Sequence, residues 1–119
     1  MPSEKGAGVR GRQAEDLCAR MLEGAGLSIV ARNFRCRMGE VDMIARDGGT
    51  LVFCEVRLRR SRQFGGAGES ITGAKRARIA AAARYYLAGR PDADCRFDVM
   101  LLDALEDARV QWIRDAFRC

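Results

Sequence analysis

The sequence predicts an α/β fold in which helices flank a central mixed β-sheet of four to five strands. Two segments, residues 9–23 and 73–88, place apolar side chains at helical spacing. Apolar runs with the composition of strands lie at residues 27–35, 39–60, 95–102 and 109–113. A turn signal divides the longest of these runs into a β-hairpin. The expected order is therefore helix, three strands, helix and two strands.

Length and charge limit the organisation of the chain. Its 119 residues fit one domain spanning residues 1–119, and a hydrophobic content of 48% is enough for a core. The net charge of +5 comes mostly from arginine, which suits phosphate contacts and is compatible with a nucleic-acid partner. No apolar run approaches membrane-spanning length and no secretory segment is evident, so we expect a cytoplasmic protein without a membrane partner.

Some kinds of chemistry are excluded by composition. The chain has no His, which removes Ser-His and Cys-His catalysis and histidine metal sites. Its five Cys include no Cys-x-x-Cys pair, which argues against a disulfide framework and a structural zinc site. Acidic and basic side chains remain as the groups that can carry chemistry.

The first helix carries one acid in an unusual position. Residues 1–8 are expected to be disordered, and the helix then runs from about Val9 to Glu23, where glycines end it. Glu15 lies at the edge of the apolar stripe, where an unpaired charge is costly. Glu15 is therefore expected either to form a boundary salt bridge with an arginine or to take part in a metal site.

The hairpin at residues 39–60 contains the strongest local signal. Asp47-Gly48-Gly49-Thr50 predicts a two-residue turn, because glycine adopts the positive φ that such turns require. This register places Asp42 directly opposite Glu55, and Glu40 opposite Arg57.

The two faces of the hairpin differ in chemistry, because side chains alternate along a strand. One face is expected to be entirely apolar and to carry Val41, Met43, Ala45, Val52, Cys54 and Val56. The other places Asp42 and Glu55 about 5 Å apart, where they repel unless a cation lies between them. Carboxylates are ligands of Mg²⁺ and Mn²⁺, so the hairpin predicts a metal site. The alternative is an ordinary amphipathic hairpin with a solvated charged end.

Basic residues surround the predicted acidic site. A glycine-rich segment at residues 59–68 fits a mobile loop over a polyanionic substrate, although plain flexibility explains it equally well. The second helix begins after the N-cap Thr72 and has cations in its first turns, which oppose the helix dipole unless phosphate binds there. The predicted nucleic-acid contacts are Arg35, Arg37, Arg59, Arg60, Arg62, Lys75, Arg76 and Arg78. Asp98 is expected to be structural and to pair with Arg96 or an adjacent arginine.

Several segments occur together in a specific order: Gly11–Leu17 (GRQAEDL), Gly39–Asp47 (GEVDMIARD), Val52–Arg57 (VFCEVR) and Arg96–Val99 (RFDV). They resemble the YraN family of small uncharacterised bacterial proteins, which is similar to archaeal Holliday-junction resolvases. The order of elements also resembles the restriction-endonuclease-like core. The usual motif of that core is an acid, then an Asp, then Glu-x-Lys on the next strand.

The resemblance implies a Mg²⁺- or Mn²⁺-dependent nuclease of structured or branched DNA that acts as a homodimer. It implies Asp42 and Glu55 as metal ligands, with Glu15 as the third acid. Arg57 occupies the position of the motif lysine. Arg57 keeps the positive charge but does not release its proton, so it can stabilise charge without transferring a proton. Replacing Arg57 with Lys is expected to raise cleavage.

Two alternatives remain open. Because the expected lysine is Arg57, the chain can instead be a catalytically inactive nucleic-acid-binding module of the same fold. It can also be a protein-interaction component in which the acids are structural. Salt-sensitive DNA binding without cleavage would indicate the first alternative, and no DNA binding would indicate the second.

Overall fold

The computed structural model describes residues 6–58, 71–90 and 93–117. Helix α1 (Gly6–Gly24) is followed by three strands, β1 (Ser28–Cys36), β2 (Gly39–Asp47) and β3 (Thr50–Leu58). Next come helix α2 (Gly73–Leu87), strand β4 (Asp94–Leu102), the short 3₁₀-helix η3 (Asp107–Arg109) and strand β5 (Val110–Phe117). The predicted α/β class and the order of elements are confirmed.

The beginning of α1 differs from the prediction. The helix was expected from about Val9, and it begins at Gly6. A glycine costs a helix only about 1 kcal/mol relative to alanine, so a helix that packs well further along extends through Gly6 and Gly8. Residues 1–5 lie outside the described part of the chain.

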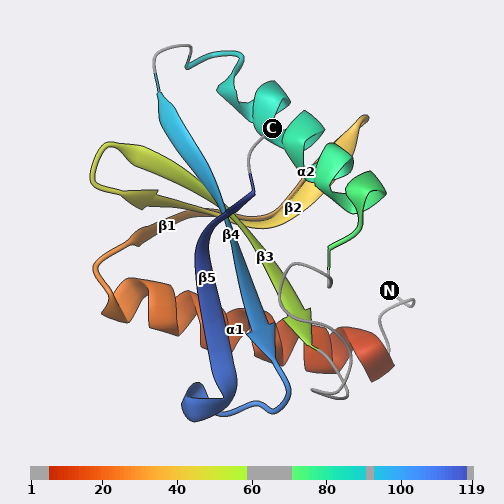
Figure 1. The fold of residues 1–119 in the computed structure, drawn as a ribbon, viewed down its shortest axis with the longest axis vertical. Helices are drawn as coiled ribbons and strands as arrows, with labels where there is room; N and C mark the ends of the chain where they lie inside the picture. Colours follow the sequence, from red (N-terminus) through yellow and green to blue (C-terminus); the bar gives the residue numbers. More distant parts are fainter. Residues whose placement is uncertain (1–5, 59–70, 91–92, 118–119) are drawn as a thin grey trace.

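The five strands form one sheet in the order β1-β2-β3-β4-β5. Neighbouring strands are antiparallel except β3 and β4, which are parallel and are connected through α2. A parallel pair requires a crossover connection, and this one places α2 on one side of the sheet (Figure 1). Helix α1 lies on the other side.

Each face of the sheet carries a hydrophobic core under one helix. The α1 core includes Ala14, Leu17, Cys18, Leu22, Met43, Ala45, Val52, Cys54, Met100 and Leu102. The α2 core includes Val41, Ile44, Leu51, Phe53, Ile79, Ala82, Ala83, Phe97, Val99 and Leu101. Because β2 and β3 contribute to both cores, side chains at their ends have a rigid support. Neither α1 nor α2, the α-helices of the described ranges, is long and apolar enough to span a membrane.

Two local predictions about turns and caps are confirmed. Asp47 pairs with Thr50 across the β2–β3 turn, in which Gly48 has a φ of 62°. Thr72 caps α2, because its Oγ1 accepts a hydrogen bond from the backbone N–H of Lys75 at 3.1 Å.

Helix α2 lies directly on the beginning of β2. A Cβ atom added at Gly39 would overlap the backbone carbonyl oxygen of Arg78, so only glycine allows this approach. The contact fixes the first turns of α2, including Lys75, next to the strand that carries Glu40 and Asp42.

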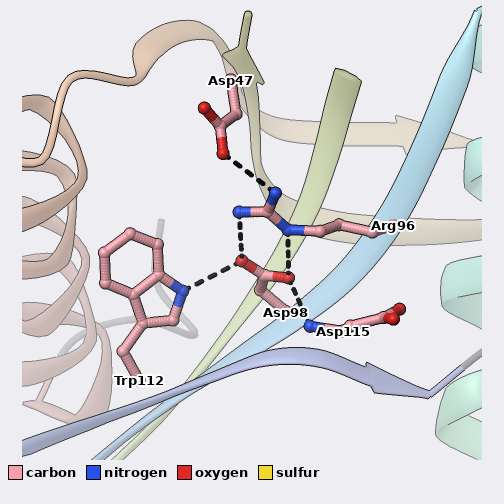
Figure 2. Close-up of polar contacts among 5 residues, drawn as sticks. All are labelled: Asp47, Arg96, Asp98, Trp112 and Asp115. Atoms are coloured by element: carbon pink, nitrogen blue, oxygen red, sulfur yellow. Dashed lines mark hydrogen bonds and ion pairs between the residues drawn. The ribbon is translucent and has the colours of Figure 1, made fainter. Parts of the chain in front are cut away.

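Asp98 is a buried carboxylate that links β4 to β5 and, through Arg96, to the end of β2 (Figure 2). It accepts hydrogen bonds from Arg96 Nε and Nη2 at 3.0 and 3.3 Å, and from Trp112 Nε1 at 2.9 Å. The backbone N–H of Asp115 donates a fourth at 2.9 Å, and Arg96 also reaches Asp47 at 2.9 Å. A buried carboxylate is tolerated when donors satisfy it in this way. The predicted pairing with Arg96 is confirmed.

Candidate functional site

Strands β2 and β3 separate where the acidic residues begin. They pair from Asp47–Thr50 to Met43–Cys54, as the predicted register requires. The predicted register was wrong beyond that point. The hydrogen-bonded ladder includes neither the predicted pair Asp42–Glu55 nor the predicted pair Glu40–Arg57. Instead, Asp42 Oδ2 accepts a hydrogen bond from the backbone N–H of Val56 at 2.8 Å. A side-chain carboxylate has replaced the carbonyl of the partner strand, so the strands part.

The alternation of side chains also resets at Asp42. Val41 packs in the α2 core and Met43 in the α1 core, although both were predicted on one face. On β1, the pairs on either side place Asn33 opposite Asp42, and Asn33 has a φ of 54°. Asparagine adopts this left-handed conformation more readily than most residues. This irregularity in β1 coincides with the reset in β2.

Glu55 is buried beside a lysine from α2. It is 3% exposed, and its Oε2 lies 3.0 Å from Lys75 Nζ. Its Oε1 is buried without a hydrogen-bond donor among the described residues. Burial, followed by the charge of Asp42, raises the pKa of Glu55 to about 7, against the opposing effect of Lys75. A carboxyl group that titrates near neutral pH is characteristic of functional sites.

Asp42 and Glu55 share one environment. Burial is the main cause that raises the pKa of Asp42, while the Val56 N–H and the charge of Lys75 act to lower it. The negative charge of Asp42 disfavours ionisation of Glu55, and a cation beside the pair opposes this effect.

Glu15 approaches this pair from α1. Its side chain is 14% exposed, and its Oε1 accepts a hydrogen bond from Asn33 Nδ2 at 3.2 Å. Arg32 Nη2 lies 3.7 Å from the same oxygen, so the arginine salt bridge considered from the sequence is present. Burial and the charge of Asp42 raise the pKa of Glu15, which places Glu15 within electrostatic reach of Asp42.

The acids do not form a complete set of metal ligands by themselves. Across residues 6–58, 71–90 and 93–117, no three His, Cys, Asp or Glu side chains are grouped so that they could hold a metal ion. The arrangement is instead a close pair, Asp42 and Glu55, with Glu15 near Asp42.

Lys75 has a contact that the sequence prediction missed. It was expected to face nucleic acid, but its Nζ lies 3.0 Å from Glu55 and 3.9 Å from Glu40. The available signal was its spacing, because Lys75 lies four residues before the buried Ile79 and so on the same helical row.

The other predicted cations occupy different places around the site. Arg35 Nε and Arg78 Nη2 lie 3.7 and 4.0 Å from Glu40, at the rim of the acidic pair. Arg76 lies instead over the ring of Phe117, with 5.6 Å between its guanidinium carbon and the ring centroid.

Arg57, which occupies the position of the motif lysine, is exposed at the end of β3. It makes no hydrogen bond or ion pair with another residue of the described ranges. Arg37 is also exposed. Arg59, Arg60 and Arg62 lie outside the described residues, together with the rest of the glycine-rich segment.

Residues 14–102 match the model of a family described as "Uncharacterised protein family UPF0102". The chain belongs to this family. A UPF0102 protein of Dechloromonas aromatica is 57% identical over 109 residues, covering 92% of this chain and 88% of the relative. Another, from Ralstonia nicotianae, is 50% identical over 122 residues, covering 98% and 92%. This membership supports the YraN-family resemblance, and the matched UPF0102 region contains Glu15, Asp42, Glu55 and Lys75.

Proposed function

We propose that this UPF0102 chain is a metal-dependent phosphodiesterase that cuts nucleic acid, with structured or branched DNA as its substrate. The observation that carries the proposal is the buried pair Asp42 and Glu55, with Glu55 Oε1 left without a donor. Asp98, the second buried acid of the described residues, accepts four hydrogen bonds and needs no further partner. Two buried carboxylates side by side carry more negative charge than one lysine balances, which supports a divalent cation as their further partner.

The residues present fit a hard divalent cation. Asp42 and Glu55 offer carboxylate oxygens, and Glu15 would complete the set directly or through water. Mg²⁺ is commonly held by one or two carboxylates together with waters and substrate phosphates, so a pair of acids suits it. When bound, Mg²⁺ or Mn²⁺ would activate a water molecule and neutralise charge on the phosphate.

Lys75 and Arg57 have separate roles in this proposal. The Lys75 side chain is 25% exposed, so its ammonium holds Glu55 in place and also presents positive charge at the site entrance. Arg57 is exposed on the strand that carries Glu55, where its guanidinium suits a phosphate of the substrate. Lys75 therefore supplies the charge nearest to the acids, and Arg57 binds the strand being cut.

A wider basic rim would hold the rest of the substrate. Arg35 and Arg78 flank Glu40 beside the acids, and the chain has a net charge of +5. Because a branched junction requires cuts in two opposed strands, we expect the active form to be a homodimer.

The direct test is cleavage of a panel of junction, flap, duplex and single-stranded DNA with Mg²⁺ or Mn²⁺. We expect the wild type to cut branched DNA, and Asp42→Asn and Glu55→Gln each to lower the rate by at least about 100-fold. The matched control is Asp94→Asn, an exposed acid on β4, which should cut normally. Equal cleavage by all four proteins, or none by the wild type, would contradict the proposal.

One observation favours a second candidate, a nucleic-acid-binding module that does not cut. Lys75 already neutralises Glu55, and no group of three metal-binding side chains is present in the described ranges. This candidate predicts salt-sensitive DNA binding that Asp42→Asn leaves intact, together with no metal-dependent product.

A further inference from the structure

A second surface, at the end of α2, has the chemistry of a site for a flat aromatic group. A pocket of about 470 Å³ is lined by Phe34, Tyr85, Tyr86, Ala88, Gly89 and Arg90. Its size lies within the range of sites for small ligands, roughly 300–1,000 Å³. No metal-binding or acidic side chain contributes to its lining.

The planar groups of the pocket are held in place by one another. The Phe34 ring centroid lies 6.2 Å from that of Tyr85 and 5.3 Å from that of Tyr86. The guanidinium carbon of Arg90 lies 4.1 Å from the Tyr86 centroid, and Arg90 Nη1 donates to the Tyr86 carbonyl at 2.7 Å. Tyr85 remains 64% exposed, as one of three large exposed hydrophobic side chains in the described ranges. One face of the pocket is therefore available to a partner.

We propose that this pocket binds an unpaired base of the nucleic-acid strand that reaches the acidic site. Aromatic rings and arginine guanidinium groups are the surfaces on which unpaired bases stack, whatever their sequence. Arg90 adds a positive charge that suits the phosphate beside such a base. A nucleobase with its phosphate therefore matches both the flat walls and the charge.

The pocket lies close enough to the acids for one nucleic-acid strand to reach both sites. Tyr85 lies ten residues after Lys75, which is about 15 Å along α2. Phe34 pairs with Val41, the residue before Asp42, and is followed by Arg35 at the acidic rim. That the occupant is nucleic acid rests on the proposed function. The pocket extends that function by selecting DNA with an unpaired base near the phosphate to be cut, as at a branch point.

The test compares binding of duplex DNA with binding of the same duplex carrying a single-stranded arm that contains 2-aminopurine. Binding is measured without divalent ions, so that no cleavage occurs. We expect tighter binding of the arm and quenching of its fluorescence by the wild type. Tyr85→Ala and Arg90→Ala should each weaken binding of the arm about tenfold and reduce the quenching, while Tyr85→Phe retains both.

Arg114→Ala is the matched control. Arg114 also stacks on a ring, with its guanidinium carbon 3.9 Å from the Trp112 centroid, but it lies on β5 at the opposite edge of the sheet from β1. Arg114→Ala removes one positive charge, as Arg90→Ala does, and should leave the preference for the arm unchanged. If Tyr85→Ala prefers the DNA with the arm as strongly as Arg114→Ala does, the pocket proposal is overturned. Quenching that depends on Tyr85 in a protein that never cuts would support the pocket and refute the nuclease.

Discussion

Glu55 and Asp98 are buried acids on adjacent strands, and their surroundings differ. Asp98 accepts four hydrogen bonds from Arg96, Trp112 and the Asp115 backbone. Glu55 has Lys75 on one oxygen and no donor on the other. A satisfied buried acid stabilises the fold, whereas an unsatisfied one with a raised pKa indicates a binding site.

Removing the Asp98 carboxylate should destabilise the chain strongly. Asp98→Ala leaves Trp112 and the Asp115 N–H without their acceptor and removes a charge partner of Arg96. We expect the free energy of unfolding to fall by about 3 kcal/mol or more, measured by urea denaturation. The emission of Trp112, the one tryptophan of the chain, should also change. Asp94→Ala, at an exposed position of the same strand, is the control and should change neither measurement.

Glu55 should make stability depend on pH in the opposite sense to an ordinary salt-bridged acid. Its pKa rises from 4.5 to about 7 on folding, so the folded state retains a proton that the unfolded chain releases. The contribution of Glu55 to the free energy of unfolding is therefore fully present below pH 4.5 and is lost as the pH rises to about 7. The loss in the free energy of unfolding should be on the order of 3 kcal/mol.

Glu55→Gln should remove this part of the pH dependence. The measurement is urea denaturation of wild type and variant between pH 4.5 and 8, with the exposed Glu23→Gln as control. If the difference in free energy of unfolding between wild type and Glu55→Gln stays constant over this range, Glu55 is ionised in the folded state and the expectation is contradicted.

At the scale of single residues, the sequence predicted the β2–β3 register from the Gly48-Gly49 turn as far as Met43 and Cys54. It did not predict that the strands part at Asp42 and Glu55, nor which residues surround these two acids. Asn33 was missed because a positive φ inside a strand leaves no trace in a pattern of alternating side chains. The Lys75 contact was missed because it depends on how α2 docks on the sheet.

At the scale of elements, the contact between α2 and β2 determines where Lys75 lies. Helices and turns were predictable from local signals such as the Thr72 cap and the glycine turn. The end of β2–β3 pairing was not, because it results from a side-chain hydrogen bond between Asp42 and Val56. The strands part at the site, so this local exception to the sheet pattern coincides with the candidate chemistry.

Gly39→Ala should separate α2 from β2. The added Cβ would overlap the Arg78 carbonyl oxygen, and backbone on both sides leaves no flexible group to move. We expect a loss of about 2 kcal/mol in the free energy of unfolding. The control is Gly49→Ala, where a Cβ meets nothing within 4 Å. Equal stability of the two variants would contradict the close contact.

The division of roles between Lys75 and Arg57 is testable by kinetics. Lys75→Met removes the charge beside Glu55 and should lower the maximal cleavage rate by about 100-fold. Arg57→Met should mainly weaken DNA binding and so raise KM, because Arg57 has no contact with the acids in the described structure. Arg57→Lys is still expected to raise cleavage. A larger fall in maximal rate for Arg57→Met than for Lys75→Met would reverse the assignment.

At the scale of the whole molecule, the two helices on opposite faces of the sheet bring the site together (Figure 1). Glu15 comes from α1, Lys75 from α2, and the acid pair from the adjacent strands β2 and β3 between them. The overall α/β order was predictable because it follows from hydrophobic spacing and turn signals. The aromatic pocket at the end of α2 was not predictable, because Phe34 and Tyr85 are distant in sequence and meet only when α2 packs on the sheet.

The central claim is that Asp42 and Glu55 hold a divalent cation. Its most direct test is a Mn²⁺ titration followed by electron paramagnetic resonance, in the presence of a branched DNA with non-hydrolysable linkages. We predict that the wild type and Asp94→Asn bind Mn²⁺ and that Asp42→Asn and Glu55→Gln each weaken binding at least about tenfold. Equal Mn²⁺ binding by all four proteins, or none by the wild type with DNA present, would contradict the claim.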